Sequence, residues 1–385
     1  MLKRLLGNTG IEVSVIGLGG EHLDGQPASR VDAVIGAALD QGISIMDVFM
    51  PGKEVRENIG QALAGKRDKV CLQGMIGSVD LSEQYDISRD LAVCQRYFED
   101  LLRYLKTDYI DFGMLFFLDS PEDIDAVIDN GVVDYARRLK REGKIRAVGA
   151  SAHNPDTARR LVEEGLVETL LFSINPAFDL MPGSGDIQEM LDKTLSQQVT
   201  VSDPKRAELY RLCQSRGVGI TVMKGLGAGK LLSLEHSPFH QALTPAQCIH
   251  YALTRPAVAS VLVGCRSVEE VVAATAYNHL EPAELDYSQA VSSFKGDARG
   301  GFQGSCVYCN HCLPCPAKID IASVNKYLDI ARLDPARVPP GVRMHYQALP
   351  AGGSECVECG NCEKRCPFAV PIRDNMRLAA QLFSQ

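Results

Sequence analysis

The chain has 385 residues, of which 23% are charged, and a formal net charge of −8 at pH 7. This length allows one large domain and a small one, and the acidic balance excludes the basic footprint of a nucleic-acid-binding protein. No apolar run approaches the ~20 residues that a membrane span needs, and the apolar part of residues 1–7 is too short for a signal peptide. We therefore expect a soluble, cytoplasmic protein without nucleic-acid or membrane partners.

Eight short apolar runs alternate with helical segments over the first 280 residues. Near-continuous Val, Ile, Leu and Met are typical of strands buried on both faces, as in a parallel sheet. Eight strand–helix alternations favour an α/β fold of the (β/α)8 type, a TIM barrel, over an open sheet. The predicted strands are Val13–Leu18, Ile43–Met46, Val70–Leu72, Tyr109–Phe117, Ile145–Val148, Thr169–Ile174, Gly219–Met223 and Val258–Val263.

Three segments of this region carry further signals. Arg89–Leu105 has apolar residues at helical spacing. Ser267, followed by Glu270, forms a capping-box pattern at the start of a helix that reaches Thr275. The polar, irregular stretch Asp179–Pro204 predicts a long loop on the catalytic face.

Eight cysteines near the C-terminus form two runs. The first reads Cys306-Val-Tyr-Cys309-Asn-His-Cys312-Leu-Pro-Cys315-Pro316, and the second reads Cys356-Val-Glu-Cys359-Gly-Asn-Cys362-Glu-Lys-Arg-Cys366-Pro367. The second run has the C-x2-C-x2-C-x3-C-P spacing of a bacterial ferredoxin, whose fourth cysteine binds the other of two [4Fe–4S] clusters. The first run is one residue shorter before its last cysteine. A zinc ribbon typically offers two cysteine pairs per ion, so two clusters are the preferred interpretation.

The cysteine ligands divide accordingly into two crossed sets. One cluster takes Cys306, Cys309, Cys312 and Cys366, and the other takes Cys356, Cys359, Cys362 and Cys315. Each run precedes a short apolar stretch that contains isoleucine, at 318–321 and 370–372, as in a ferredoxin with an internal repeat. The predicted domains are a barrel at 1–280, a linker at 281–304 and a small ferredoxin-like iron–sulfur domain at 305–385, with a helical insertion at about 317–355.

Four segments resemble, in order, landmarks of the aldo-keto reductase family: Lys3–Ser14, Asn58–Leu63, Asp108–Asp111 and Gly264–Ser267. With its cysteine runs the chain resembles the branch of that family with a C-terminal ferredoxin-like domain. The resemblance implies Asp, Tyr, Lys and His at the barrel mouth, where the Tyr protonates a carbonyl while NADPH supplies hydride. Asp47 matches the Asp, but residues 48–52 contain no Tyr, and Met75 and Phe116 stand at the Lys and His positions. The resemblance therefore argues against ordinary carbonyl reduction.

The positions that hold the nicotinamide cofactor in the family are also altered. Ala152 replaces the Asn of a Ser-Asn pair, Leu171 stands near the expected Gln, Met223 stands at the ring-stacking position, and Val272–Ala274 lacks a Glu-Asn pair. The residues that remain as cofactor-binding candidates are Gly264, Arg266 and Ser267. They bind a phosphate at a helix N-terminus or only cap the last helix, and both interpretations stay open.

The carboxyl ends of the strands converge at the mouth of such a barrel. The polar residues at these ends are Glu21, His22, Asp47, Glu54, His153, Asn154, Asn175 and Lys224. The catalytic candidates are Asp47, because a buried carboxylate is costly unless used or paired, His153 as a general acid or stacking group, and Lys224 as a ligand for carboxylate, phosphate or flavin. The alternatives are a solvated His153 beside a capping Asn154, and an exposed Lys224.

These features predict an iron–sulfur oxidoreductase that relays electrons through two [4Fe–4S] clusters to a cofactor or small-molecule substrate at the barrel mouth. Ferredoxin or another donor would supply the electrons, and an anaerobic cytosol suits the clusters. One alternative is an NAD(P)H-linked reductase that uses Asp47 with His153 or Lys224. Another is a non-catalytic electron-transfer or redox-sensing protein. No sequence motif supports NAD(P)H or flavin.

Overall fold

The computed structural model describes residues 1–81, 85–179, 204–237, 239, 241–281, 283–287, 304, 306, 312–332, 335–338, 340–366 and 369–383. The chain divides into two compact units, one made of Met1–Asp80 and Ile87–Lys295 and the other of Leu81–Asp86 and Gly296–Gln385. Residues 180–203 of the predicted loop and 288–303 of the predicted linker lie outside the described residues.

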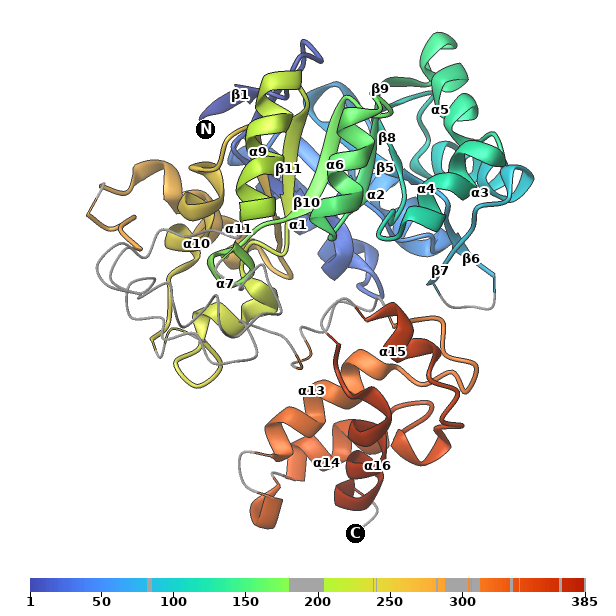
Figure 1. Cartoon of the computed structure of the whole chain (residues 1–385). Helices are drawn as coiled ribbons and strands as arrows, with labels where there is room; N and C mark the ends of the chain where they lie inside the picture. The colour runs from blue at the N-terminus through green and yellow to red at the C-terminus, as the bar shows by residue number, and fades with distance from the viewer. Residues whose placement is uncertain are drawn as a thin grey trace. The chain divides into compact units, whose positions relative to one another are not determined.

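Eight parallel strands close into a barrel in the first unit (Figure 1). Around the barrel the order is β10, β11, β12, β3, β4, β5, β8, β9. The strands are β3 (Ile16–Gly19), β4 (Ile45–Val48), β5 (Cys71–Ile76), β8 (Ile110–Leu115), β9 (Ile145–Ala152), β10 (Thr169–Ser173), β11 (Gly219–Met223) and β12 (Val258–Gly264). Every strand overlaps one predicted apolar run, so the (β/α)8 prediction is confirmed.

The first predicted run joins two different elements. Val13 belongs to an antiparallel hairpin of β1 (Lys3–Leu5) and β2 (Glu12–Ser14), which lies outside the barrel. The barrel strand β3 begins only at Ile16. The Ser14 hydroxyl donates to the Ile16 carbonyl at 2.6 Å, which supports the bend between β2 and β3. An apolar run therefore does not show where one strand ends and the next begins.

Helices follow most of the barrel strands (Figure 1). They are α1 (Ala28–Asp40), α2 (Lys53–Ala62), α3 (Leu91–Leu105), α4 (Pro121–Asp129), α5 (Val132–Arg141), α6 (Pro155–Glu163), α7 (Pro176–Asp179), α9 (Pro204–Arg216), α10 (Pro245–Leu253) and α11 (Val268–Thr275). The predicted helix at Arg89 begins two residues later, because the Asp90 side chain accepts from the Val93 amide at 2.9 Å and caps the first turn. Ser267 caps α11 as predicted.

The helices pack on the barrel through apolar stripes. In α3 the residues Cys94, Phe98, Leu101 and Leu105 are buried at helical spacing. Gly60 lets α2 approach α3 closely, since a Cβ at Gly60 would lie 2.7 Å from the Tyr104 carbonyl oxygen. Among the described residues, no helix combines the length and apolarity needed to cross a membrane.

The second unit is mainly helical in its described part (Figure 1). Its helices are α13 (Ile321–Ala331), α14 (Pro340–Gln347), α15 (Asn361–Arg365) and α16 (Ile372–Phe383). α13 and α16 each begin at an isoleucine shortly after a cysteine run, and they meet where the Asn375 amide donates to the Asn325 oxygen at 2.6 Å. The two cysteine runs therefore lead into two paired helices.

A small core holds the second unit together. The Tyr346 ring stacks on Phe383 with 4.0 Å between centroids, and the Tyr346 hydroxyl accepts from the Gly353 amide at 2.7 Å. A side chain at position 353 would collide with the Met376 carbonyl, so a glycine is required there. The helical insertion predicted at about 317–355 contains α13 and α14, whereas the sequence analysis did not predict α16.

Candidate active site

Four ionisable side chains come from strand ends or the residues that follow them. Asp47 lies in β4, Asp119 follows β8, His153 follows β9, and Lys224 follows β11. These strands are parallel, so their carboxyl ends open at the same end of the barrel. The predicted candidates Asp47, His153 and Lys224 therefore lie at the barrel mouth, together with Asp119, which the sequence analysis overlooked.

Asp119, His153 and Lys224 form a continuous hydrogen-bonded row. Asp119 Oδ2 lies 2.7 Å from His153 Nδ1, and His153 Nε2 lies 2.7 Å from Lys224 Nζ. The backbone amide of His153 also donates to Asp119, and the Asn154 amide donates to Asp119 Oδ1 at 3.1 Å. The carboxylate thus fixes the imidazole from one side, and the lysine amine contacts it from the other.

The electrostatics of this row define its protonation. Burial opposes the ionisation of Asp119, but the hydrogen bonds that it accepts from His153 and from the Asn154 amide outweigh burial and hold the pKa of Asp119 below its usual value. Burial lowers the pKa of His153, and the positive charge of Lys224 lowers it further. A neutral His153 therefore donates its Nδ1–H to the Asp119 carboxylate and accepts a hydrogen bond from the Lys224 ammonium at Nε2.

The backbone of Lys224 adopts a left-handed conformation, with φ of 58°. Residues other than Gly, Asn and Asp rarely do so, because their Cβ atom is strained there. The Lys224 carbonyl accepts from Asn175 Nδ2 at 3.0 Å and from the Gly227 amide at 2.9 Å. These two bonds stabilise the conformation that brings the amine to His153.

Phe117 forms a second strained position beside the row, with φ of 55°. Its amide donates to Ser151 Oγ at 2.7 Å, and its carbonyl accepts from Arg89 Nη2 at 2.7 Å. The Phe117 ring lies 5.3 Å from the His153 ring. Strained residues persist where the surroundings hold them, often at functional sites, and here two of them flank one histidine.

Asn154 caps α6, as the sequence alternative proposed, because its side chain accepts from the Asp156 amide at 2.9 Å. His153, however, is 9% exposed. The alternative of a solvated His153 is therefore wrong. The alternative of an exposed Lys224 also fails, since Lys224 is only half-exposed and contacts His153.

Asp47 belongs to a second network, inside the barrel. Gln73 Nε2 donates to Asp47 Oδ1 at 3.0 Å, and Thr221 Oγ1 donates to Gln73 Oε1 at 3.0 Å. Burial raises the pKa of Asp47 to about 7; the Gln73 hydrogen bond opposes this rise and the charge of Glu21 adds to it. Asp47 therefore titrates near neutral pH.

The other polar candidates surround this centre. Burial raises the pKa of Glu21, while the charges of Lys224 and Arg266 oppose the rise. The His22 ring covers Gly264, where a Cβ would collide with it. Glu54 lies in the first turn of α2 and is exposed.

The predicted phosphate site begins α11. Ser267 accepts from the Glu270 amide at 3.4 Å, and the Glu270 carboxylate accepts from the Arg266 amide at 2.6 Å. The side chains of Ser267 and Glu270 thus accept from amides at the N-terminus of α11. This arrangement agrees with the interpretation in which these residues cap the helix. A role of Gly264, Arg266 and Ser267 in cofactor binding stays a prediction.

A buried ionic cluster lies close to the row. Arg206 Nε donates to Asp179 Oδ1 at 2.7 Å, and Arg206 also donates to the Ser173 carbonyl. The hydroxyls of Tyr210 and Tyr251 donate to the same Asp179 carboxylate at 2.7 and 3.1 Å. This cluster joins α7, α9 and α10 and lies near enough to His153 for the Arg206 charge to lower the pKa of His153.

The side of the mouth at β4, β5 and β8 is apolar. Met75 is 2% exposed and Phe116 is 5% exposed. The Phe116 ring stacks on Phe49 with 6.3 Å between centroids. The two positions at which the family resemblance implies Lys and His thus belong to packed apolar surroundings.

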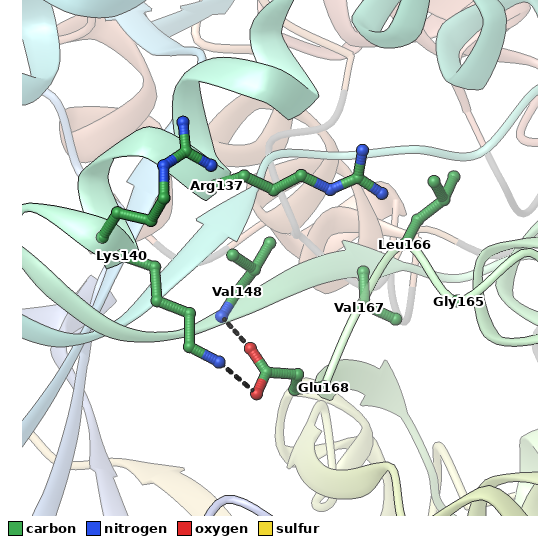
Figure 2. Close-up of a pocket in the computed structure, with 8 residues that line it drawn as sticks. Arg137, Lys140, Val148, Gly165, Leu166, Val167 and Glu168 are labelled. Atoms are coloured by element: carbon green, nitrogen blue, oxygen red, sulfur yellow. Dashed lines mark hydrogen bonds and ion pairs between the residues drawn. The ribbon is translucent and has the colours of Figure 1, made fainter.

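A pocket in the structure lies away from this centre, between α5 and the amino end of β10 (Figure 2). Figure 2 shows Lys140 and Glu168 pointing toward each other, 2.6 Å apart, with the Val148 amide donating to the same carboxylate at 3.0 Å. Residues at the amino ends of barrel strands generally serve stability. We therefore assign no catalytic role to this pocket.

The cysteine runs are partly described: Cys309 lies outside the described residues, and the other seven lie within them. Arg365 Nη1 donates to the Pro314 carbonyl at 3.1 Å. Arg365 precedes Cys366 in the sequence, and Pro314 precedes Cys315. The two runs therefore meet at their last cysteines. Burial raises the pKa of Cys362 to about 11, with smaller contributions from the nearby thiols of the same run.

Among the described residues, no three His, Cys, Asp or Glu side chains are arranged to hold a single metal ion. A four-iron cluster spreads its thiolate ligands around four metal atoms, which is a wider arrangement. The soft sulfur donors and the meeting of the two runs fit such a cluster.

Comparisons with known proteins agree with the barrel architecture. The aldo/keto reductase family model matches residues 15–242. The uncharacterized oxidoreductase YqkF of Bacillus subtilis (strain 168) is 26% identical over 288 residues, which cover 70% of this chain and 89% of that protein. L-galactose dehydrogenase of Arabidopsis thaliana is 24% identical over 306 residues, which cover 70% and 85%.

Solved structures share the fold. The holo form of aldo-keto reductase AKR11C1 from Bacillus halodurans matches with a TM-score of 0.60 and 23% identity, covering 76% of this chain and 96% of that chain. An aldo/keto reductase from Klebsiella pneumoniae in complex with NADP and acetate matches with a TM-score of 0.54 and 20% identity, with the same coverage. Since the family model spans more than half of the sequence, the chain belongs to the aldo/keto reductase family of oxidoreductases.

Proposed function

We propose that this chain is an oxidoreductase that reduces a small molecule at the barrel mouth, with Lys224, His153 and Asp119 as its proton-handling row. The observation that carries the proposal is the pair of 2.7 Å contacts that join the three side chains. A carboxylate that fixes a neutral imidazole, which in turn contacts an amine, resembles the relays used in general acid–base catalysis. This row supplies a proton where the family tyrosine is missing.

In this proposal Lys224 donates a proton to the developing anion of the substrate. The resulting amine keeps its hydrogen bond to Nε2 of the neutral His153, the Asp119 carboxylate holds the imidazole through its Nδ1–H, and solvent returns the proton to Lys224. Asp119 also selects the His153 tautomer with hydrogen on Nδ1. The apolar side formed by Met75 and Phe116 excludes water from the substrate.

The eight cysteines of the two runs would hold two [4Fe–4S] clusters, in the crossed sets Cys306, Cys309, Cys312, Cys366 and Cys356, Cys359, Cys362, Cys315. Such clusters supply single electrons at low potential. The spacing of the second run and the Arg365–Pro314 hydrogen bond support this assignment. Ferredoxin or another one-electron donor would reduce them.

Anaerobic purification followed by iron and sulfide assays, a visible spectrum and chromatography of released cofactors tests the proposal. We expect about eight irons per chain, as two four-iron clusters require. Cys359→Ser should lose about half of the iron, whereas Cys71→Ser, a barrel cysteine outside both runs, should keep all of it. A colourless, iron-free preparation would contradict the cluster assignment and leave the proton-handling row to be tested by itself.

An NAD(P)H-linked reductase is the second candidate. It is favoured by the structural similarity to the Klebsiella pneumoniae reductase in complex with NADP. In that case hydride from the nicotinamide would replace the single electrons, and Lys224 or Asp47 would supply the proton. Quenching of NAD(P)H fluorescence on addition of the protein supports this candidate, and unchanged fluorescence at saturating cofactor counts against it.

A further inference from the structure

Asp47 is a buried carboxyl whose surroundings contain no opposing cation among the described residues. Among those residues the neutral amide of Gln73 donates a hydrogen bond to it, and Glu21 is the charged group that acts on it. Asp47 is 7% exposed, and Gln73 and Thr221 are fully buried. An isolated buried carboxylate is unfavourable, so the group takes up a proton instead.

The hydrogen bonds define which oxygen carries that proton. Thr221 donates to Gln73 Oε1, so the Gln73 amide must present its Nε2–H to Asp47 Oδ1. Oδ1 is thereby an acceptor, and Oδ2 is left to carry the hydrogen. This row of hydrogen bonds links Thr221 in β11 to Gln73 in β5 and then to Asp47 in β4. Because β12 and β3 separate β11 from β4 in the sheet, the row crosses the barrel interior.

We propose that Gln73 and Thr221 are positioning residues that orient the buried Asp47 acid with its proton on Oδ2, giving the barrel mouth a second proton donor besides the Lys224 row. This rests on the proposed function for its use in catalysis. When Asp47 donates, its Oδ2–H bond breaks, the electron pair stays on Oδ2, and the hydrogen bond from Gln73 stabilises the carboxylate. The substrate receives its electrons from the same one-electron donor or, in the alternative, as hydride.

Two separate proton donors suit a substrate that takes up two electrons and two protons at different atoms. The chemical class is then a conjugated or carbonyl compound, in which one proton goes to oxygen and the other to carbon. A hydride mechanism on a simple carbonyl needs a single proton from the protein. The second donor thus favours the stepwise electron route over the hydride route.

The charged groups that act on Asp47 are few. Glu21, in the turn η1 (Gly20–Leu23) after β3, raises the pKa of Asp47 by like-charge repulsion. Glu21 is in turn influenced by Lys224, Arg266 and Asp24. From β5 and β11 the hydrogen-bonded groups are the neutral side chains of Gln73 and Thr221. Substitutions of these residues therefore shift the titration of Asp47 in opposite and predictable directions.

Infrared titration of the full-length protein in heavy water tests the proposal without a substrate and without any dependence on the clusters. We expect a carboxylic-acid band that disappears near neutral pH and is missing in Asp47→Asn. Gln73→Leu should raise the midpoint by about 1 pH unit, because the carboxylate loses its donor. Thr221→Val should raise it less, and Glu21→Gln should lower it.

The matched control is Thr169→Val, which removes another fully buried barrel hydroxyl, one that donates to the Met114 sulfur. It should leave the midpoint unchanged. Identical spectra for the wild type and Asp47→Asn would overturn the proposal. So would an unchanged midpoint in both Gln73→Leu and Thr221→Val, which keep the carboxyl and so test the positioning role even if Asp47→Asn does not fold. Either failure would leave the Lys224 row and the clusters untouched.

Discussion

The barrel and the cysteine-bearing unit obtain their chemistry in different ways. In the barrel the polar side chains bind one another: Asp119 contacts His153, and Gln73 contacts Asp47. In the second unit the candidate ligands are cysteines that the sequence spacing identifies. The contact between the two cysteine runs is the hydrogen bond from Arg365 to the Pro314 carbonyl. The barrel site is thus organised by its own hydrogen bonds, whereas we expect the second unit to depend on metal for its order.

Removal of iron should separate the two units most clearly. Because metal binding contributes directly to the folding free energy of small metal domains, chelation under oxidising conditions should abolish or strongly lower the thermal transition of the second unit. The barrel transition should stay within a few degrees. Differential scanning calorimetry of the same sample before and after chelation measures both thermal transitions. A barrel transition that falls together with that of the second unit would contradict the difference between the two units.

Arg206→Met should have the largest effect on the barrel alone. It leaves the fully buried Asp179 carboxylate without its cation, which costs roughly 3–5 kcal/mol of unfolding free energy. The double variant with Asp179→Asn should recover a large part of the loss. Denaturant unfolding followed by circular dichroism measures the change, and equal loss in the single and double variants would argue against a paired charge.

Asp47→Asn should stabilise the barrel at alkaline pH. The raised pKa of Asp47 means that the folded state holds a proton which the unfolded state releases, so wild-type stability falls as pH rises from 3.8 to about 7. At 1.36 kcal/mol per pH unit the gain at pH 8 is about 4 kcal/mol at most. It should vanish near pH 4. A melting-temperature difference that does not vary with pH would show that Asp47 is ionised in the folded protein.

Ser267→Ala should have the smallest effect and bears on the cofactor alternative. Loss of the cap on α11 costs about 1 kcal/mol. If the helix start also binds a nucleotide phosphate, the affinity for NADPH should fall in parallel. Ser120→Ala removes the serine that caps α4 and serves as the control for stability without an effect on NADPH.

The sequence predicts the barrel well, because each parallel strand is buried on both faces and reads as an apolar run. It predicts Asp47, His153 and Lys224 as mouth residues from their places at strand ends. Asp119 follows the same rule, since it lies two residues after the predicted run Tyr109–Phe117, whereas the family resemblance implies a polar residue at position 116, where this chain has Phe.

Other features depend on contacts that spacing does not reveal. Asp179 and Arg206 are 27 residues apart, and nothing in the local pattern pairs them. The Gln73–Thr221 bond joins strands on different sides of the barrel, so it follows only from closure of the sheet. The helix α16 was readable, because Ile372, Met376, Ala379 and Phe383 are apolar at helical spacing.

The protonation of His153 tests the central claim most directly. Nitrogen-15 NMR of histidine-labelled protein, with the signal assigned by His153→Gln, reports the tautomer and the pKa. We expect a neutral ring at pH 7 with its hydrogen on Nδ1, and a higher pKa in Lys224→Met, because the repelling charge is removed. A hydrogen on Nε2, or a pKa unchanged by Lys224→Met, would contradict the Lys224–His153–Asp119 row.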